Sequence, residues 1–183
     1  MKNHDRILWI TRTGVLVALL VVLQWATSGT QAFASQYITG SCVNAVLAVA
    51  VLAAGLWSGV TVALISPFCA KLFGIGPQLI QIVPAIAVGN LVFVLALHFL
   101  IGRRSRSILL RALGLVIAAA AKFLTLYLLV VKFIVPMLAD NLKPQQITTF
   151  SAMFSWPQMV TALIGGAVAL AILPVLKKAI RRN

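Results

Sequence analysis

The chain has almost no acidic residues. Its 183 residues include two of Asp and Glu together, Asp5 and Asp140, against 15 of Lys and Arg. Two carboxylates so far apart in the sequence do not make a general acid–base pair, a hard-metal site or a carboxylate relay for ion coupling. The sequence also has no HExxH motif, no GxSxG motif and no Walker lysine loop. We therefore expect neither catalytic nor metal-binding residues, and no ATPase activity in this chain.

Cysteine is equally scarce. Cys42 and Cys69 both lie in apolar runs, and neither belongs to a CxxC or Cys/His pattern. This spacing predicts no metal site and no disulfide framework. We interpret both residues as small buried hydrophobes.

Apolar residues are what the chain has in abundance. Hydrophobic types make up 62% of the sequence and charged types 9%, which is typical of an integral membrane protein rather than a soluble domain. Because a backbone in lipid must satisfy its own hydrogen bonds, each long apolar run predicts a helix. We expect an all-α bundle of six membrane-spanning helices in a single domain, residues 1–183, with spans at about 8–25, 40–56, 58–73, 78–101, 108–136 and 156–176.

The first apolar run has a competing interpretation. Basic residues precede it, and the tripeptide AFA at 32–34 resembles a signal-peptidase site. We favour a first membrane span over a cleaved signal peptide.

The basic residues predict the orientation. Lys and Arg gather at the N-terminus, in the loop after the fourth run and at the C-terminus, whereas the opposite side has only Lys71, Lys132 and Lys143. The positive-inside rule then puts both termini in the cytoplasm. These clusters are short and lie beside spans, so nucleic-acid binding is a poor explanation of the net charge of +13.

Polar residues gather on the predicted outer side. The stretch GPQLIQIVPAIAVGN at 76–90 places Gln78 and Gln81 three residues apart, which predicts one helix face at the outer mouth of the bundle. We expect Pro77 in the first turn of that helix and Pro84 to bend it and widen a cavity. Interfacial solvation and hydrogen bonds between helices remain the alternative for each single residue.

Lys122 falls near the middle of the fifth apolar run. A lysine at that depth usually faces the bundle interior or water, and it marks a functional site by default. It has no evident acidic partner, so backbone carbonyls, water or an anionic ligand group are its candidate partners, and snorkelling is the alternative. For Asn90 we expect a bond between helices, and Asn44 is ambiguous.

The first run contains a pattern that allows close helix contact. Within TRTGVLVALLVVLQW at 11–25, Gly14 and Ala18 are one turn apart, so another helix can approach closely there. Packing within the bundle itself is the alternative.

With these features the chain resembles the substrate-binding S components of energy-coupling factor (ECF) transporters, which are six-helix membrane subunits that capture vitamins. The segment TGSCVNAVLAVAVLAAGLWSGVTVALISPFCAKLFGIGPQLIQIVPAIAVGN at 39–90 is most similar to the cobalamin-type subgroup. The family typically has an AxxxA pattern in its first span that docks on the transmembrane T component, and Gly14 and Ala18 match it with Gly in the first place. The resemblance implies two cytoplasmic ATPase partners, a bacterial cell membrane, no enzyme activity and no cofactor.

The resemblance also implies a site near the outer face. The residues it brings there are Gln24, Trp25, Gln31, Tyr37, Gln78, Gln81, Lys122, Tyr127, Trp156 and Gln158. Neutral amides and aromatic rings suit the amide rim and apolar face of cobalamin or cobinamide, the expected transported substrate. Pantothenate, folate or riboflavin is the alternative substrate, and a non-transporting membrane scaffold is the alternative function.

Overall fold

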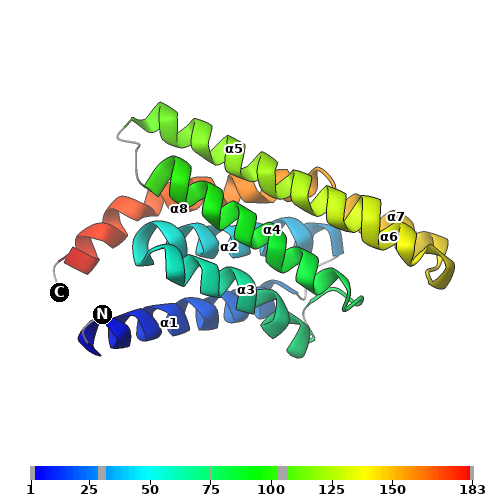
Figure 1. The fold of residues 1–183 in the computed structure, drawn as a ribbon, viewed down its shortest axis with the longest axis horizontal. Helices are drawn as coiled ribbons and strands as arrows, with labels where there is room; N and C mark the ends of the chain where they lie inside the picture. The colour runs from blue at the N-terminus through cyan, green and yellow to red at the C-terminus, as the bar shows by residue number, and fades with distance from the viewer. Residues whose placement is uncertain (1–2, 29–31, 75, 103–106, 182–183) are drawn as a thin grey trace.

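The computed structural model describes residues 3–28, 32–74, 76–102 and 107–181, and in these ranges the regular structure is entirely helical (Figure 1). The elements in chain order are α1 (Asn3–Ser28), α2 (Ala32–Val49), the π-helical segment η1 (Ala50–Ala54), α3 (Leu56–Leu72), α4 (Ile82–Leu97), the π-helical η2 (His98–Gly102), α5 (Ile108–Leu126), the π-helical η3 (Tyr127–Ile134), α6 (Val135–Met137), the 3₁₀ turn η4 (Ala139–Asn141), α7 (Pro144–Met153) and α8 (Pro157–Arg181).

Five helical stretches of the described chain are long and apolar enough to cross a membrane. They are Arg6–Thr27, Gln36–Ala54, Ile82–Gly102, Ile108–Met137 and Pro144–Lys178. The apolar helix Leu56–Leu72 lies between the second and third of them and has 17 residues, slightly fewer than the roughly 20 that a perpendicular span needs. The chain is therefore a multi-pass membrane protein.

Gly55 separates α2 and η1 from α3. Its φ of +103° is open to glycine and strained for other residues, so the helix breaks here. The N–H of Gly59 donates to the Gly55 carbonyl 3.1 Å away, which starts α3 at once. The boundary that the sequence placed between two nearly continuous apolar runs thus lies at a single residue.

The structure corrects the expected loop at 26–39. Residues 32–39 are already helical, because α2 begins at Ala32, and the AFA tripeptide at 32–34 lies in its first turns. The small and polar residues of 32–39 can form a helix when one side of that helix borders a polar cavity. As a consequence Gln36, Thr39 and Gly40 share a helix face with residues deeper in the bundle.

The structure also corrects the expected start of the fourth helix. α4 begins at Ile82 with Gln81 as its N-cap, so Gln78 and Gln81 precede the helix and do not share a helix face. Pro77 lies in the preceding turn segment, and Pro84 occupies the first turn of α4, where its missing N–H costs no helical hydrogen bond. Pro84 therefore starts the helix and does not bend it.

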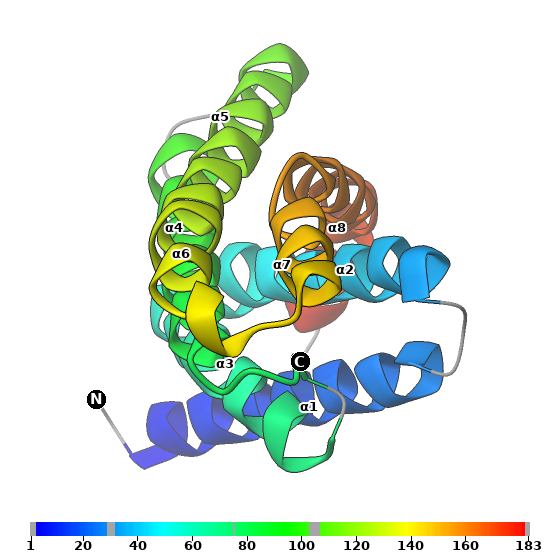
Figure 2. The same ribbon diagram turned by 90° about the vertical axis from the view of Figure 1, so that its right-hand side faces the viewer.

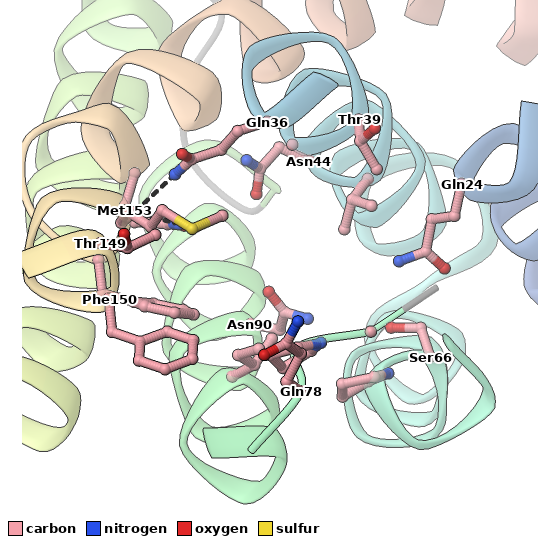
Figure 3. Close-up of a pocket in the computed structure, with 18 of the residues that line it drawn as sticks. Gln24, Gln36, Thr39, Asn44, Ser66, Gln78, Asn90, Thr149, Phe150 and Met153 are labelled. Carbon is pink, nitrogen blue, oxygen red and sulfur yellow. Dashed lines mark hydrogen bonds between the residues drawn. The ribbon is translucent and has the colours of Figure 1, made fainter. Parts of the chain in front are cut away.

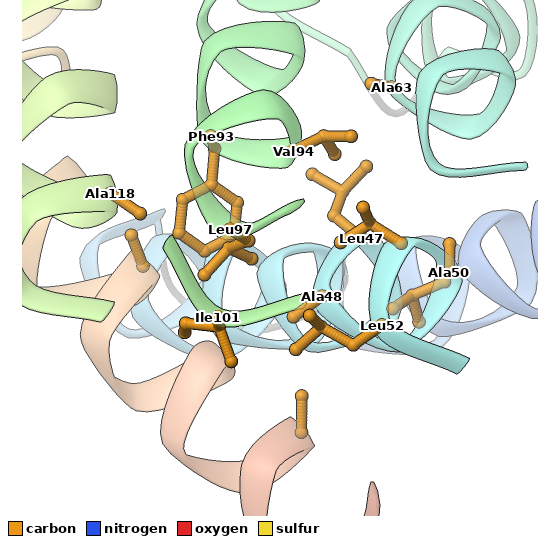
Figure 4. Packing of buried hydrophobic residues seen from close by; sticks show 14 of the residues in the cluster. Leu47, Ala48, Ala50, Leu52, Ala63, Phe93, Val94, Leu97, Ile101 and Ala118 are labelled. Carbon is orange, nitrogen blue, oxygen red and sulfur yellow. The ribbon is translucent and has the colours of Figure 1, made fainter. Parts of the chain in front are cut away.

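The start of α1 and the end of α8 lie at the same end of the bundle, and α7 lies near the opposite end (Figures 1 and 2). We refer to these as the terminal end and the α7 end. Toward the terminal end, α2, α3, α4, α5 and α8 enclose an apolar core that includes Leu47, Leu52, Phe93, Leu97 and Ile101 (Figure 4).

Close helix approach in the core depends on glycine. A Cβ added to Gly165 of α8 would meet the Ser41 carbonyl oxygen and, at 2.7 Å, the Ala45 nitrogen of α2. A Cβ at Gly59 of α3 would lie 2.8 Å from the Cβ of Val51. These backbones therefore pack at distances that a larger residue does not allow.

Candidate functional site

The α7 end contains a cavity of about 650 Å³, within the range of pockets that hold small-molecule ligands. Its walls come from several elements: the end of α1, most of α2, the second half of α3, the turn at 76–78, the first three turns of α4, the end of α5, α7 along its whole length and the start of α8. The lining residues are Gln24, Gln36, Thr39, Gly40, Val43, Asn44, Ser66, Pro67, Gly76, Pro77, Gln78, Ile86, Asn90, Lys122, Lys143, Gln145, Gln146, Thr149, Phe150, Met153, Phe154 and Gln158.

The lining is rich in amides and hydroxyls and poor in charge. Eight glutamine or asparagine side chains, two threonines and a serine line it, and the charged side chains among the described lining residues are Lys122 and Lys143. The described lining contains no Asp or Glu. Such a site can donate and accept hydrogen bonds, and it carries only positive charge.

Lys122 anchors a buried polar cluster between three helices. Its Nζ donates to Asn44 Oδ1 at 2.6 Å and to Asn90 Oδ1 at 2.7 Å. Asn44 Nδ2 in turn donates to Thr161 Oγ1 at 3.3 Å. Lys122, Asn44 and Asn90 are at most 3% exposed, so this network lies inside the bundle, where hydrogen bonds are strong and missing ones costly.

The same lysine marks the boundary between the cavity and the apolar core. Its Nζ lies 5.5 Å from the centroid of the Phe93 ring, a distance at which a cation is attracted to the ring face. Phe93 is fully buried in the core cluster, whereas Lys122 also lines the cavity. Lys122 thus forms part of the cavity floor.

Three other polar groups that line the cavity lack partners in the described structure. Gln24 Oε1, Gln36 Oε1 and Ser66 Oγ are buried and make no hydrogen bond with the residues that the structure describes. Figure 3 shows Gln24 and Ser66 together on one side of the cavity, across from Thr149 and Phe150. Buried polar atoms are nearly always satisfied, so three exceptions around one space indicate that something else completes them.

Hydrogen bonds fix α7 beside the cavity. The carbonyl oxygen of Met153 accepts from Gln36 Nε2 at 2.6 Å and from Gln158 Nε2 at 3.0 Å, which ties the end of α7 to α2 and α8 (Figure 3). Lys71 stabilises the turn at 76–78, which also borders the cavity. Its Nζ donates to the carbonyl oxygens of Pro77 and Gln78 at 3.0 and 2.9 Å. Lys71 is one of the lysines that the sequence placed on the outer side.

The residues that the sequence assigned to the site separate into two groups. Gln24, Gln78, Lys122 and Gln158 line the cavity. The described residues outside its lining are Trp25, Tyr37, Gln81, Tyr127 and Trp156, and Gln31 lies outside the described residues.

Three of the four aromatic members of the second group, Tyr37, Tyr127 and Trp156, pair with other rings. Tyr37 and Trp156 lie with ring centroids 6.1 Å apart, and Tyr127 lies 5.9 Å from Phe123. Trp25 is among the exposed residues of α1. These rings are better placed to anchor the helices at the edge of the bundle than to contact a ligand.

The site predicted from the sequence left out two walls of the cavity, the residues of α7 that line it and the lining face of α2. Gln36, Thr39, Gly40, Val43 and Asn44 follow helical spacing and all line it. This spacing predicts one polar helix face, but it was not recognised because residues 26–39, between the first two expected spans, were expected to form a loop. Ser66 and Pro67 of α3 gave no signal in an otherwise apolar run.

Gly14 and Ala18 of α1 lie on the surface of the bundle. Both are exposed, and a Cβ added to Gly14 would meet nothing within 4 Å. Gly14 therefore does not serve close packing inside the chain. Its side of α1 is open to lipid or to another protein.

The chain was compared with protein families, curated proteins and solved structures. The curated proteins gave no match, and neither did the solved structures. The model of a family described as "ECF transporter, substrate-specific component" matches residues 9–177, which include every described wall of the cavity. The chain therefore belongs to the family of ECF transporter substrate-specific components.

Proposed function

We propose that the cavity at the α7 end captures a vitamin from outside a bacterial cell, and that this chain is the substrate-binding subunit of an ECF transporter. The observation that carries the proposal is that buried polar groups without partners in the described structure lie around one cavity. Members of this family are transport proteins rather than enzymes, and family membership supports vitamin uptake as the task. A binding subunit needs such a cavity, and a catalytic one would need reactive groups.

The charge pattern supports an outward-facing cavity. Lys177 and Lys178 lie near the end of α8, and the start of α1 lies at the same end of the bundle. If this basic end is cytoplasmic, as the positive-inside rule requires, the cavity opens toward the cell exterior. Both termini are then inside the cell.

Partner proteins supply the energy in this proposal. The sequence contains no ATPase motif, so uptake against a gradient needs a transmembrane T component and two cytoplasmic ATPases. The exposed surface at Gly14 and Ala18 is the docking site that we propose for the T component, because small residues let a partner helix come close.

Two substrate classes are candidates. The expected resemblance to the cobalamin-type subgroup and the many amides of the lining favour cobalamin or cobinamide. The volume of about 650 Å³ and the lysine at the floor favour a smaller vitamin such as pantothenate. Folate and riboflavin are further alternatives.

A membrane scaffold is the competing function. It would need no cavity, and its amides would pair with one another. The polar side chains instead converge on a space, with Gln24, Gln36 and Ser66 left incomplete (Figure 3). This supports binding over a scaffold role.

Reconstitution tests the proposed function. The purified chain is combined with a T component and two ATPases in proteoliposomes, and uptake of radiolabelled vitamins is followed with and without ATP. We expect ATP-dependent uptake of one vitamin. Uptake of none, by a complex that hydrolyses ATP and contains the folded chain, would contradict the proposal.

A further inference from the structure

On the basis of the proposed function, we propose that the captured vitamin carries a carboxylate, which Lys122 and Asn90 bind at the cavity floor, and that hydrogen-bond donors of the same vitamin meet Gln24 and Ser66. The substrate class and the orientation of the ligand follow from the same set of contacts.

The hydrogen-bond geometry of Lys122 leaves one donor over. An ammonium group has three N–H donors and no acceptor. Two of them are used by Asn44 Oδ1 and Asn90 Oδ1, at 2.6 and 2.7 Å. All three side chains line the cavity, so a ligand oxygen can take the third donor. Asn90 also lines the cavity, and its side-chain amide carries N–H donors that a ligand oxygen can accept.

The charge balance points to an anion. Lys122 is 3% exposed, and no described residue that lines the cavity is acidic. Asp140, in the turn between α6 and α7, is exposed and does not line the cavity. A buried ammonium with only neutral amides and a ring beside it is costly in a membrane bundle, and a negative charge nearby would lower that cost. A ligand carboxylate supplies that charge through a charge-assisted hydrogen bond.

A single negative charge fits better than two. Lys143, the second lysine of the lining, is exposed and follows η4 at the edge of the cavity, whereas the floor holds one ammonium group. A carboxylate matches one lysine and one amide N–H in charge and in number of acceptors. A phosphate dianion would leave charge unmatched at the floor.

Other polar groups of the cavity lining need donors from the ligand. Gln24 Oε1 and Gln36 Oε1 accept hydrogen bonds only, and both are buried without a partner. Ser66, 1% exposed, has a hydroxyl group in the same condition. Amide N–H or hydroxyl groups of a ligand would complete them. The ligand is therefore an acid with hydroxyl or amide groups at a distance from its carboxylate.

Binding of matched acid and neutral compounds to the purified chain tests the inference. The pairs are pantothenate and panthenol, biotin and biotinamide, nicotinate and nicotinamide, and cobyric acid and cobinamide, with riboflavin and thiamine added. Affinity is measured by titration calorimetry in detergent. A hydrogen bond between charged groups contributes more to the binding free energy than a hydrogen bond between neutral groups. We therefore expect the acid of one pair to bind about 10- to 100-fold more tightly than its neutral partner.

Two variants remove the preference by opposite routes. Lys122→Met deletes the ammonium group, and Asn90→Asp places a carboxylate of the protein 2.7 Å from it, where the amide oxygen now lies. In both we expect the preference for the acid to fall below about 3-fold. Asn90→Asp retains a partner for Lys122 and so guards against the failure of Lys122→Met to fold. Thermal unfolding shows that each variant is folded.

The outcomes separate the inference from the proposed function. Equal affinity for acid and neutral compounds, or tight binding of cobinamide, riboflavin or thiamine alone, would overturn the carboxylate while a vitamin carrier remained. An acid preference that persists in both folded variants would overturn the role of Lys122. Binding of no compound by the folded wild-type chain would overturn both proposals.

Discussion

Ser58 and Ser66 lie two turns apart on α3, and they differ in whether their hydroxyl groups have hydrogen-bond partners. Both are fully or almost fully buried, at 0% and 1% exposure. Ser58, toward the terminal end, accepts a hydrogen bond from Thr13 Oγ1 at 2.9 Å. Ser66, at the α7 end, has no partner. A residue of another helix satisfies Ser58, whereas Ser66 borders the cavity and is left open.

The glycines show the same division. Gly59 and Gly165 bring backbones into contact in the packed part of the bundle, whereas Gly14 on α1 touches nothing. The packed part supplies rigidity, and the cavity and the exposed side of α1 supply surfaces for other molecules. Substitutions should therefore change stability in the packed part of the bundle, vitamin affinity in the cavity and partner binding on the exposed side of α1.

The largest expected effect is at Gly165. Gly165→Leu forces a side chain into the backbone of α2 at Ser41 and Ala45, so we expect a loss of about 3 kcal/mol or more of unfolding free energy. Thermal unfolding in detergent measures it. Gly14→Leu is the matched control, since a Cβ there meets nothing within 4 Å. Equal melting temperatures of the two variants would contradict the packing of α8 on α2.

The next effect is at Asn44, which joins the cavity to the packed bundle. Asn44→Leu leaves Lys122 with one partner fewer and removes the donor to Thr161. We expect a loss of about 1–3 kcal/mol in the same unfolding measurement. Asn141→Leu, at an exposed position of η4, serves as control and should change stability by less than about 0.5 kcal/mol. A wild-type melting temperature for Asn44→Leu would show that the cluster contributes nothing to the fold.

Substitution of the two serines by alanine tests directly whether a buried hydroxyl group with a partner differs from one without. Ser58→Ala removes the acceptor of Thr13 and should destabilise the chain by about 1 kcal/mol. Ser66→Ala removes a buried group without a partner, so the ligand-free chain should keep its stability or gain up to about 1 kcal/mol. In titrations with the vitamin that binds, Ser66→Ala should weaken affinity about 3- to 10-fold, and Ser58→Ala should not. Effects of the same sign on stability would contradict the contrast.

The smallest effect on the fold is expected at Gly14. Gly14→Leu should leave stability within about 0.5 kcal/mol of wild type, and vitamin affinity unchanged, because the position is exposed and far from the cavity lining. Co-purification with the T component should fall at least about 10-fold, since the larger side chain separates the two helices. Undiminished co-purification would place the docking surface elsewhere.

The helices could be predicted from the sequence where an apolar run continued without interruption. The helical stretch Ile108–Met137 matches the run expected at 108–136, and Gly55 lies within the expected boundary near 55–59. The family was also recognised from such features, and the match over residues 9–177 confirms it. The cobalamin-type subgroup stays a prediction.

The cavity was harder to predict because its walls are far apart in the chain. Lys122 bonds to Asn44, 78 residues earlier, and to Asn90, 32 residues earlier. No local pattern encodes such a contact, although the depth of Lys122 singled it out as a polar group that needed partners. Gln78 lines the cavity from a turn rather than from the expected helix face, because α4 begins only at Ile82.

The most direct test of the central claim is the stoichiometry and affinity of vitamin binding by the purified wild-type chain, measured by titration calorimetry alongside Ser66→Ala. The account predicts one vitamin bound per chain, with weaker binding in the variant, because Ser66 Oγ is one of the open groups of the cavity. Tight binding that is identical in wild type and in Ser66→Ala, Gln24→Leu and Lys122→Met would place the vitamin elsewhere and contradict the account.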